Sequence, residues 1–163
     1  MTASSFSPTL LEDLRQKGWS AATDLVPTST AEDLREDLLR HQREDGLRPA
    51  QVGRAELKQS APEVRGDLIR WIDPENPSRA EKNLFIWLDD LKNFLNQNLM
   101  LGLREEELHY ALYPPGGRYL KHRDCFKNTD QRVLSFVLYL NKEWAPQWGG
   151  QIALYNERNP ERK

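Results

Sequence analysis

Apolar residues recur at helical spacing in the first 45 positions and again near the middle of the chain. Leucines at that spacing follow Pro8 and predict a short first helix. A second helix is expected to begin at Thr30, whose side chain caps free N–H groups, with Asp33 three residues on as in a capping box. The longest leucine stripe, over 84–99, predicts the third helix.

From residue 47 onward the pattern changes to short alternating or continuous apolar runs. Strands are expected at 52–53, 68–72, 107–113, 118–122, 132–140 and 151–156. Glycine-rich turns are expected at 114–117 and 147–150. Helices followed by antiparallel strands predict an α+β fold in which helices pack against a β-sandwich or barrel. We expect one domain, with a helical region at 1–45 and a strand-rich core at 46–163.

Composition narrows the class of protein. The chain has 163 residues, of which 38% are hydrophobic and 29% charged, and these values fit one globular domain. A net charge of −2, with scattered basic residues, offers no field for nucleic acid. No apolar stretch approaches the roughly 20 residues that cross a bilayer, and residues 1–8 do not form a secretory signal. We therefore expect neither a membrane nor a nucleic-acid partner. A single cysteine cannot form an internal disulfide, so we expect a cytoplasmic location.

Candidate chemistry centres on the sequence YLKHRD at 119–124. His122 and Asp124 are two residues apart, and on an extended strand such residues point to the same side. An imidazole nitrogen and a carboxylate oxygen can then converge on one ion, as two vertices of the facial triad that binds Fe(II). Taken alone, the pair is common, and a surface histidine and aspartate at a strand end is the simpler interpretation.

The flanking sequence favours the metal-site interpretation. The pair follows YPPGGRY at 113–119 and precedes VLSFVLYLN at 133–141, Trp144 and WGG at 148–150, while VRGDLIRW occupies 64–71. This ordered set of motifs resembles the catalytic core of the prolyl-hydroxylase-type 2-oxoglutarate oxygenases, and most of all the bacterial relatives of the hypoxia-factor hydroxylases. The resemblance runs from about residue 47 to residue 155.

The resemblance implies a distorted double-stranded β-helix, jelly-roll or cupin-like, with N-terminal helices packed on one face. It implies Fe(II)- and 2-oxoglutarate-dependent hydroxylation of a C–H bond by O₂, with decarboxylation of 2-oxoglutarate to succinate. The implied substrate is a prolyl residue of a protein or peptide, and L-ascorbate is a further candidate cofactor. His122 and Asp124 match the first two iron ligands.

Further roles are implied by position. Tyr113 and Tyr139 match residues of the 2-oxoglutarate pocket, where the second tyrosine hydrogen-bonds the distal carboxylate. Arg65, Asp67 and Tyr119 match residues at the substrate entrance, and 54–63 matches a loop that closes over a peptide. Simpler interpretations stay open, because Tyr139 also suits a core aromatic, and Arg65 with Asp67 suits an ion pair at a strand start.

His109 alternates with Tyr113 along one predicted strand and therefore shares its face. We expect a buried histidine that is satisfied by a neighbouring group rather than a third ligand.

The resemblance also implies a second metal histidine and a basic anchor for 2-oxoglutarate on later strands. Only 39 of the 163 residues follow Asp124, and none is a histidine. We therefore expect a truncated or interrupted form of a longer enzyme, with the C-terminal strands of the β-helix missing. The alternative function is a non-catalytic remnant that at most binds a peptide.

Overall fold

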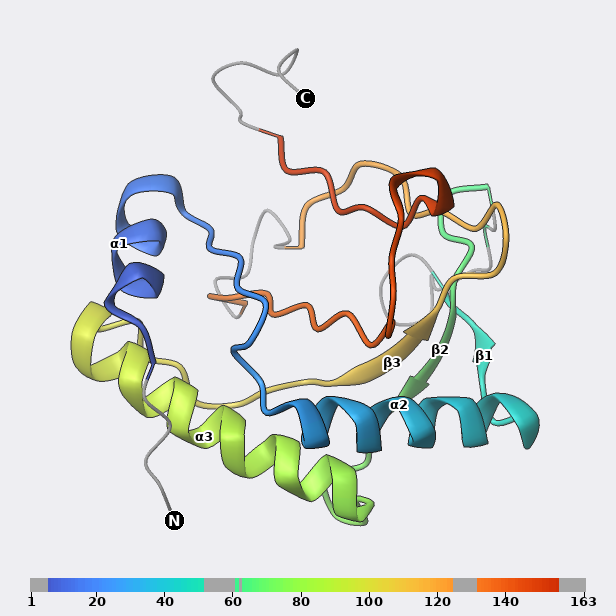
Figure 1. The fold of residues 1–163 in the computed structure, drawn as a ribbon, viewed down its shortest axis with the longest axis horizontal. Helices are drawn as coiled ribbons and strands as arrows, with labels where there is room; N and C mark the ends of the chain where they lie inside the picture. The colour runs from blue at the N-terminus through green and yellow to red at the C-terminus, as the bar shows by residue number, and fades with distance from the viewer. Residues whose placement is uncertain (1–5, 52–60, 62, 125–131, 156–163) are drawn as a thin grey trace.

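The computed structural model describes residues 6–51, 61, 63–124 and 132–155, and combines helices with one small sheet (Figure 1). The helices are α1 (Pro8–Lys17), α2 (Thr28–Arg43) and α3 (Arg79–Leu99), followed late in the chain by the 3₁₀ turn η2 (Pro146–Trp148). The strands β1 (Arg48–Pro49), β2 (Leu68–Trp71) and β3 (His109–Leu112) pair antiparallel in the order β1-β2-β3. The α+β class is thus confirmed, whereas the double-stranded β-helix stays a prediction.

Local sequence explains where two of the helices begin. The Ser7 hydroxyl accepts a hydrogen bond from the Thr9 N–H at 3.2 Å, so it caps α1 as a serine before a proline commonly does. At α3, Ser78 and Glu81 form a capping box in which each side chain accepts from the other's backbone N–H, at 3.1 and 2.7 Å.

The expected start of the second helix at Thr30 is wrong. Helix α2 begins at Thr28, follows Pro27 and has no side-chain cap. The Pro27 carbonyl accepts the Ala31 N–H at 3.1 Å, so Thr30 already lies within the first turn of the helix, where its side chain is buried.

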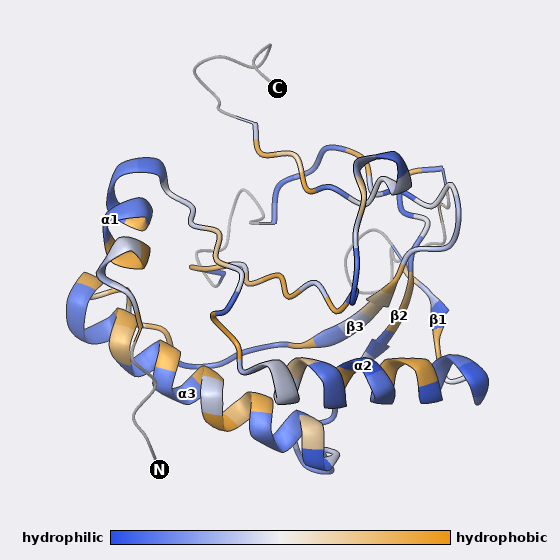
Figure 2. Ribbon diagram, viewed as in Figure 1, coloured by the Kyte–Doolittle hydropathy of each residue, from blue (hydrophilic) through white to orange (hydrophobic). Residues whose placement is uncertain are grey.

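The core lies where α2 and α3 meet each other and the sheet. Figure 2 shows apolar and polar residues on different faces of both helices. The buried residues of the core come from all three helices, the segments beside them and β3. They are Leu11, Val26, Leu34, Leu38, Leu47, Ala80, Leu84, Trp87, Leu88, Leu91, Leu95 and Tyr110. Because the core joins helices from the first 45 residues to the sheet, both regions depend on the same buried surface.

The segment 132–140 alternates between two faces as a strand does. Its even-numbered residues from Leu134 to Leu140 pack against the core, and the ring centroids of Phe136 and Trp87 are 5.5 Å apart. Its odd-numbered residues are exposed on the opposite face. In Figure 1 the segment runs beside β3, on the same side of α2 and α3 as the sheet.

Three of the expected strands form no ladder in the described part of the chain. Residues 132–140 and 151–155 have no strand assignment, and the 118–122 region makes one isolated bridge between Arg65 and Tyr119. An alternation of apolar and polar residues indicates which side of a segment is buried. A β-ladder also requires a neighbouring strand with which the backbone forms hydrogen bonds. The strand expected at 52–53 lies outside the described residues. Of the loop expected at 54–63, the structure describes residues 61 and 63 alone. Over the described ranges, no helix combines the length and apolar character needed to cross a bilayer.

Two residues of α3 provide a matched test of this core. Leu95 is 1% exposed and Ile86 is 62% exposed. We expect Leu95→Ala to lower the free energy of unfolding by about 2–5 kcal/mol, because it leaves a cavity among packed side chains. Ile86→Ala is expected to change that free energy by less than about 1 kcal/mol. Urea denaturation of both variants makes the comparison, and equal losses would contradict the assigned core.

Candidate metal centre

Backbone pairing brings Arg65 and Tyr119 face to face. The two residues form an antiparallel bridge, flanked by hydrogen bonds of 2.9 Å from Gly66 N–H to the Arg118 carbonyl and from Leu120 N–H to the Val64 carbonyl. This arrangement is a non-hydrogen-bonded pair, the type in which opposite side chains approach most closely. The cross-strand partner of Tyr119 is therefore an arginine.

The glycine turn before Tyr119 allows this approach. A Cβ added at Gly117 would lie 2.9 Å from the Pro114 carbonyl oxygen and 3.1 Å from the Gly66 carbonyl oxygen. Only a residue without a side chain fits between these backbone atoms. The turn expected at 114–117 is present, and its last glycine allows the backbone of the turn to approach the backbone at Gly66 closely.

Arg65 is held by a buried carboxylate. Its Nε and Nη2 donate to Asp67 Oδ1 and Oδ2 at 2.9 and 3.0 Å, and the Asp67 side chain has no exposed surface. Burial lowers the pKa of Arg65, but the hydrogen bond and charge of Asp67 outweigh it, and the pKa lies above its ordinary value. The two-point contact fixes the plane of the guanidinium group.

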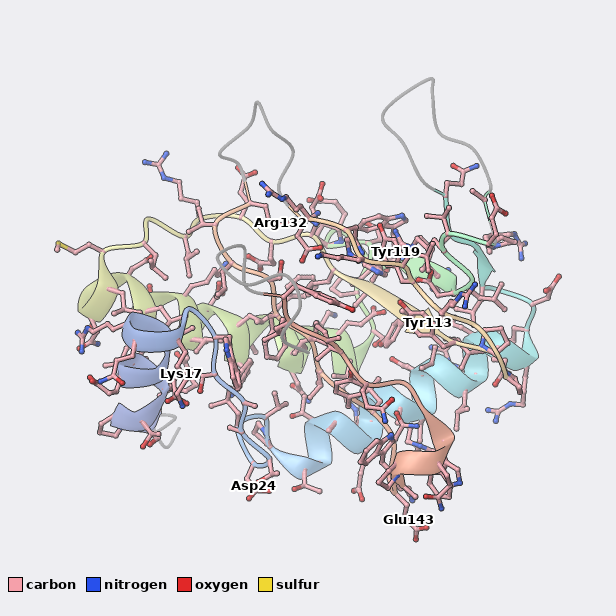
Figure 3. The ribbon with its side chains drawn as sticks, turned by 90° about the horizontal axis from the view of Figure 1, so that it is seen from above. Lys17, Asp24, Tyr113, Tyr119, Arg132 and Glu143 are labelled. Carbon is pink, nitrogen blue, oxygen red and sulfur yellow. The ribbon has the colours of Figure 1, made fainter. Side chains whose placement is uncertain are left out.

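Tyr119 connects this ion pair to His122. The guanidinium carbon of Arg65 lies 4.8 Å from the centroid of the Tyr119 ring. The His122 ring stacks on Tyr119 with centroids 3.6 Å apart and planes 14° apart. Figure 3 shows Tyr119 and Tyr113 near one another beside β3. One line of contacts therefore runs from the buried Asp67 to an imidazole at the surface.

His122 and Asp124 converge as their spacing predicted, although they lie in an irregular segment, with bends at 121 and 124, rather than in a strand. Nε2 of His122 is 3.2 Å from Oδ1 of Asp124. The other polar atom of each side chain is also engaged. His122 Nδ1 lies 2.7 Å from the Leu120 carbonyl oxygen, to which it can only donate, and Asp124 Oδ2 accepts a hydrogen bond from the Ser135 hydroxyl.

The chemistry of this pair fits a divalent cation. One imidazole nitrogen and one carboxylate oxygen face each other, and this donor set suits Fe(II). The contacts to Leu120 and Ser135 are of the kind that orient metal ligands from behind. Across the described ranges no group of three His, Cys, Asp or Glu side chains gathers, so this part of the chain supplies two donors.

His109 lies apart from this pair, on β3. Its cross-strand partner is Trp71, and the centroids of the two rings are 4.8 Å apart. The expectation that His109 is buried is wrong, because its position on the sheet leaves it exposed. The groups packed around its ring still displace water from it, which lowers the pKa of His109, and the Arg65 charge acts in the same direction. Its ring contact is therefore with a neighbouring aromatic group.

The two tyrosines expected at the cosubstrate pocket lie on exposed surface. Tyr113 directly follows β3 and is half-exposed; partial burial raises its pKa, and the Asp67 carboxylate adds to the effect. Tyr139 is 52% exposed, and its hydroxyl donates to the Gly150 carbonyl at 2.9 Å. Tyr139 is therefore not a core aromatic: it belongs to the outer face of 132–140.

Sequence reasoning missed Ser135, which holds Asp124 across eleven positions of the chain. A signal was present, because Ser135 and Tyr139 are four residues apart in an alternating segment and so share one face. The contact of His122 with the Leu120 carbonyl had no sequence signal, since every residue carries a carbonyl.

Comparisons with known proteins agree on one family. A model of the 2OG-Fe(II) oxygenase superfamily matches residues 108–163. The chain is 33% identical over 104 residues to human Egl nine homolog 1 and 32% identical over 104 residues to the rat protein of that name. The crystal structure of a Pseudomonas putida prolyl-4-hydroxylase matches with a TM-score of 0.69 and 33% identity, covering 85% of this chain and 70% of that one.

This chain belongs to the 2OG-Fe(II) oxygenase superfamily. Within it, the chain is of the prolyl-hydroxylase type, as the resemblance predicted. The matches to Egl nine homolog 1 take in 60% of this chain but only 24% of the human protein and 30% of the rat protein.

The Arg65–Asp67 pair leads to a prediction about stability. We expect Asp67→Asn to lower the free energy of unfolding by about 3 kcal/mol, because it leaves the largely buried Arg65 without its counter-charge. Asp33→Asn is the control, since Asp33 pairs with an Arg79 side chain that is 84% exposed, and about 0.5 kcal/mol or less is expected. Denaturant unfolding of both variants measures the difference, and a cost for Asp67→Asn no larger than the control's would contradict the ion pair.

Proposed function

We propose that this chain provides part of the active site of an Fe(II)- and 2-oxoglutarate-dependent hydroxylase. The reaction uses O₂, hydroxylates a C–H bond and converts 2-oxoglutarate to succinate and CO₂. The observation that carries the proposal is the convergence of His122 Nε2 and Asp124 Oδ1 at 3.2 Å, with the other polar atom of each side chain held by the protein. The pair also lies within the stretch that the family model matches.

In this proposal His122 and Asp124 hold the iron, and when bound Fe(II) supplies the activation of O₂. The Asp124 carboxylate offsets one positive charge, and the neutral imidazole of His122 provides a nitrogen donor. The fixed hydrogen bonds to Leu120 and Ser135 keep both donors aimed at the same point. Tyr113 and Tyr139 line the cosubstrate side, where their hydroxyls can donate to a carboxylate.

A prolyl residue of a protein or peptide is the substrate that the comparisons favour. The matching Pseudomonas putida structure is that of a prolyl-4-hydroxylase, and the match covers most of this chain's length. Arg65, Asp67 and Tyr119 are assigned to the substrate side. Asp67 has no exposed surface, so it can act there only through Arg65. We also propose a cytoplasmic location, which rests on the single cysteine. A role for L-ascorbate rests on the family resemblance.

A second candidate function is a non-catalytic form that at most binds a peptide. The observation that favours it is that, in the part of the chain that the structure describes, only two candidate ligands come together. The two candidates differ in whether this pair binds a divalent cation.

Metal binding tests the leading proposal directly. We expect the chain to bind Mn(II), used as a stand-in for Fe(II), and His122→Ala or Asp124→Ala to weaken binding at least about tenfold, because each removes one of the donors. His109→Ala is the matched control, since it removes an exposed histidine that belongs to no ligand group of the described residues. Isothermal titration calorimetry gives all four affinities.

Three results would contradict the proposal. Unchanged affinity in both His122→Ala and Asp124→Ala would remove the metal site from this pair. An equal loss in His109→Ala would make that histidine part of the site. No Mn(II) binding by the unsubstituted chain would favour the non-catalytic form.

Tyr139 provides a test of the cosubstrate side. If its hydroxyl exchanges the Gly150 carbonyl for a carboxylate of 2-oxoglutarate, Tyr139→Phe removes a charge-assisted hydrogen bond worth about 1.5–3 kcal/mol. We expect 2-oxoglutarate to bind the Mn(II)-loaded chain roughly 10- to 100-fold more weakly. Tyr155→Phe, another exposed tyrosine, should leave that affinity unchanged. Similar 2-oxoglutarate affinities in the Tyr139→Phe variant and the unsubstituted chain would exclude Tyr139 from the pocket.

A further inference from the structure

We propose that Tyr119 is a positioning residue of the metal site, and that its aromatic ring holds the His122 imidazole in the orientation in which Nε2 meets a cation. This inference rests on the proposed function, because it takes His122 as a metal ligand. It assigns Tyr119 a task distinct from contact with the substrate.

The need for such a residue follows from where His122 sits. The residue lies in an irregular segment outside the sheet, and its side chain is 38% exposed. Its ring is tied to the backbone by one hydrogen bond, from Nδ1 to the Leu120 carbonyl. This hydrogen bond holds Nδ1, but coupled rotation about the Cα–Cβ and Cβ–Cγ bonds can still tilt the ring around that atom, and such a tilt would carry Nε2 away from Asp124.

The stacked ring of Tyr119 removes that rotation. Its centroid lies 3.6 Å from the His122 centroid, and the planes are 14° from parallel, so the imidazole is covered over one face. A turn of the imidazole about its hydrogen bond would drive ring atoms into Tyr119. The hydrogen bond and the stack together therefore define both the position and the plane of the ligand.

Tyr119 can hold another ring because it is itself held. It faces Arg65 across a backbone bridge, and the guanidinium group lies 4.8 Å from its centroid. Both oxygens of the buried Asp67 carboxylate bind that guanidinium group. The orientation of His122 thereby depends, through two intervening side chains, on a carboxylate without exposed surface.

The ring of Tyr119, rather than its hydroxyl, makes these contacts. Its neighbours Arg65 and His122 both lie against the aromatic face. Phenylalanine preserves that face and leucine does not. The two substitutions therefore separate a positioning role from any role of the hydroxyl group.

The experiment compares Mn(II) affinity, by calorimetry, in Tyr119→Phe, Tyr119→Leu and the unsubstituted chain. We expect Tyr119→Leu to bind Mn(II) about 10-fold more weakly or worse, the usual effect of losing a group that orients a ligand, and Tyr119→Phe to bind within about twofold of the original. Trp71→Leu is the matched control, because Trp71 is an exposed aromatic residue that lies against the other surface histidine, His109.

A second readout requires no metal. The face of the Tyr119 ring shields the ring protons of His122, so their NMR signals should move downfield in Tyr119→Leu and stay nearly in place in Tyr119→Phe. A change in overall stability alone would not move these signals selectively. The signals of His109 should not shift in either Tyr119 variant, and they serve as the internal reference.

The outcomes separate this inference from the function on which it rests. If His122→Ala loses Mn(II) while Tyr119→Leu binds as tightly as the original, the metal site stands and the positioning role is overturned. If Tyr119→Phe loses as much affinity as Tyr119→Leu, or Trp71→Leu loses as much, the role of the stacked ring is likewise overturned. If His122→Ala keeps full Mn(II) affinity, the proposed function itself fails.

Discussion

The buried ion pair of Arg65 and Asp67 links the core of this protein to its surface site. Asp67 precedes β2, and its backbone carbonyl accepts the N–H of Ala50, next to β1, at 2.9 Å. Its carboxylate is fully buried and fixes the guanidinium group, against which Tyr119 lies. Removing either charge would leave the other without compensation in a poorly hydrated place, so the pair is costly to break. The sheet therefore sets the orientation of groups that lie outside it.

The helices could be predicted from the sequence because their signals are local. The leucine stripe of α3 and its capping box lie within one stretch of sequence. The start of α2 was misplaced because Pro27 precedes that helix and provides no side-chain cap. Strands β2 and β3 were expected, and β1 was not. The segment 132–140 was expected to be a strand, and its residues do alternate between the core and the surface. It forms no ladder, because hydrogen-bonded partners depend on distant parts of the chain, and a two-residue period contains no information about them.

The site was predictable only in part. The spacing of His122 and Asp124 predicted their convergence, yet the two residues meet in an irregular segment rather than on a strand, where the Leu120 carbonyl and the Ser135 hydroxyl hold them. The stack of His122 on Tyr119 could not be read from strand periodicity, because residues three apart on a strand point to opposite faces. The sequence therefore identified the two candidate ligands, but it did not predict the contacts that orient them.

Binding of a divalent cation by the oriented pair of His122 and Asp124 can be observed directly. Crystals of the chain grown with Mn(II), with diffraction data collected at a wavelength where manganese scatters anomalously, locate the ion without assumption. We expect an anomalous peak within bonding distance of both His122 Nε2 and Asp124 Oδ1, the imidazole and carboxylate donors of the pair. A peak at His109 or elsewhere, with none between these two atoms, would contradict it.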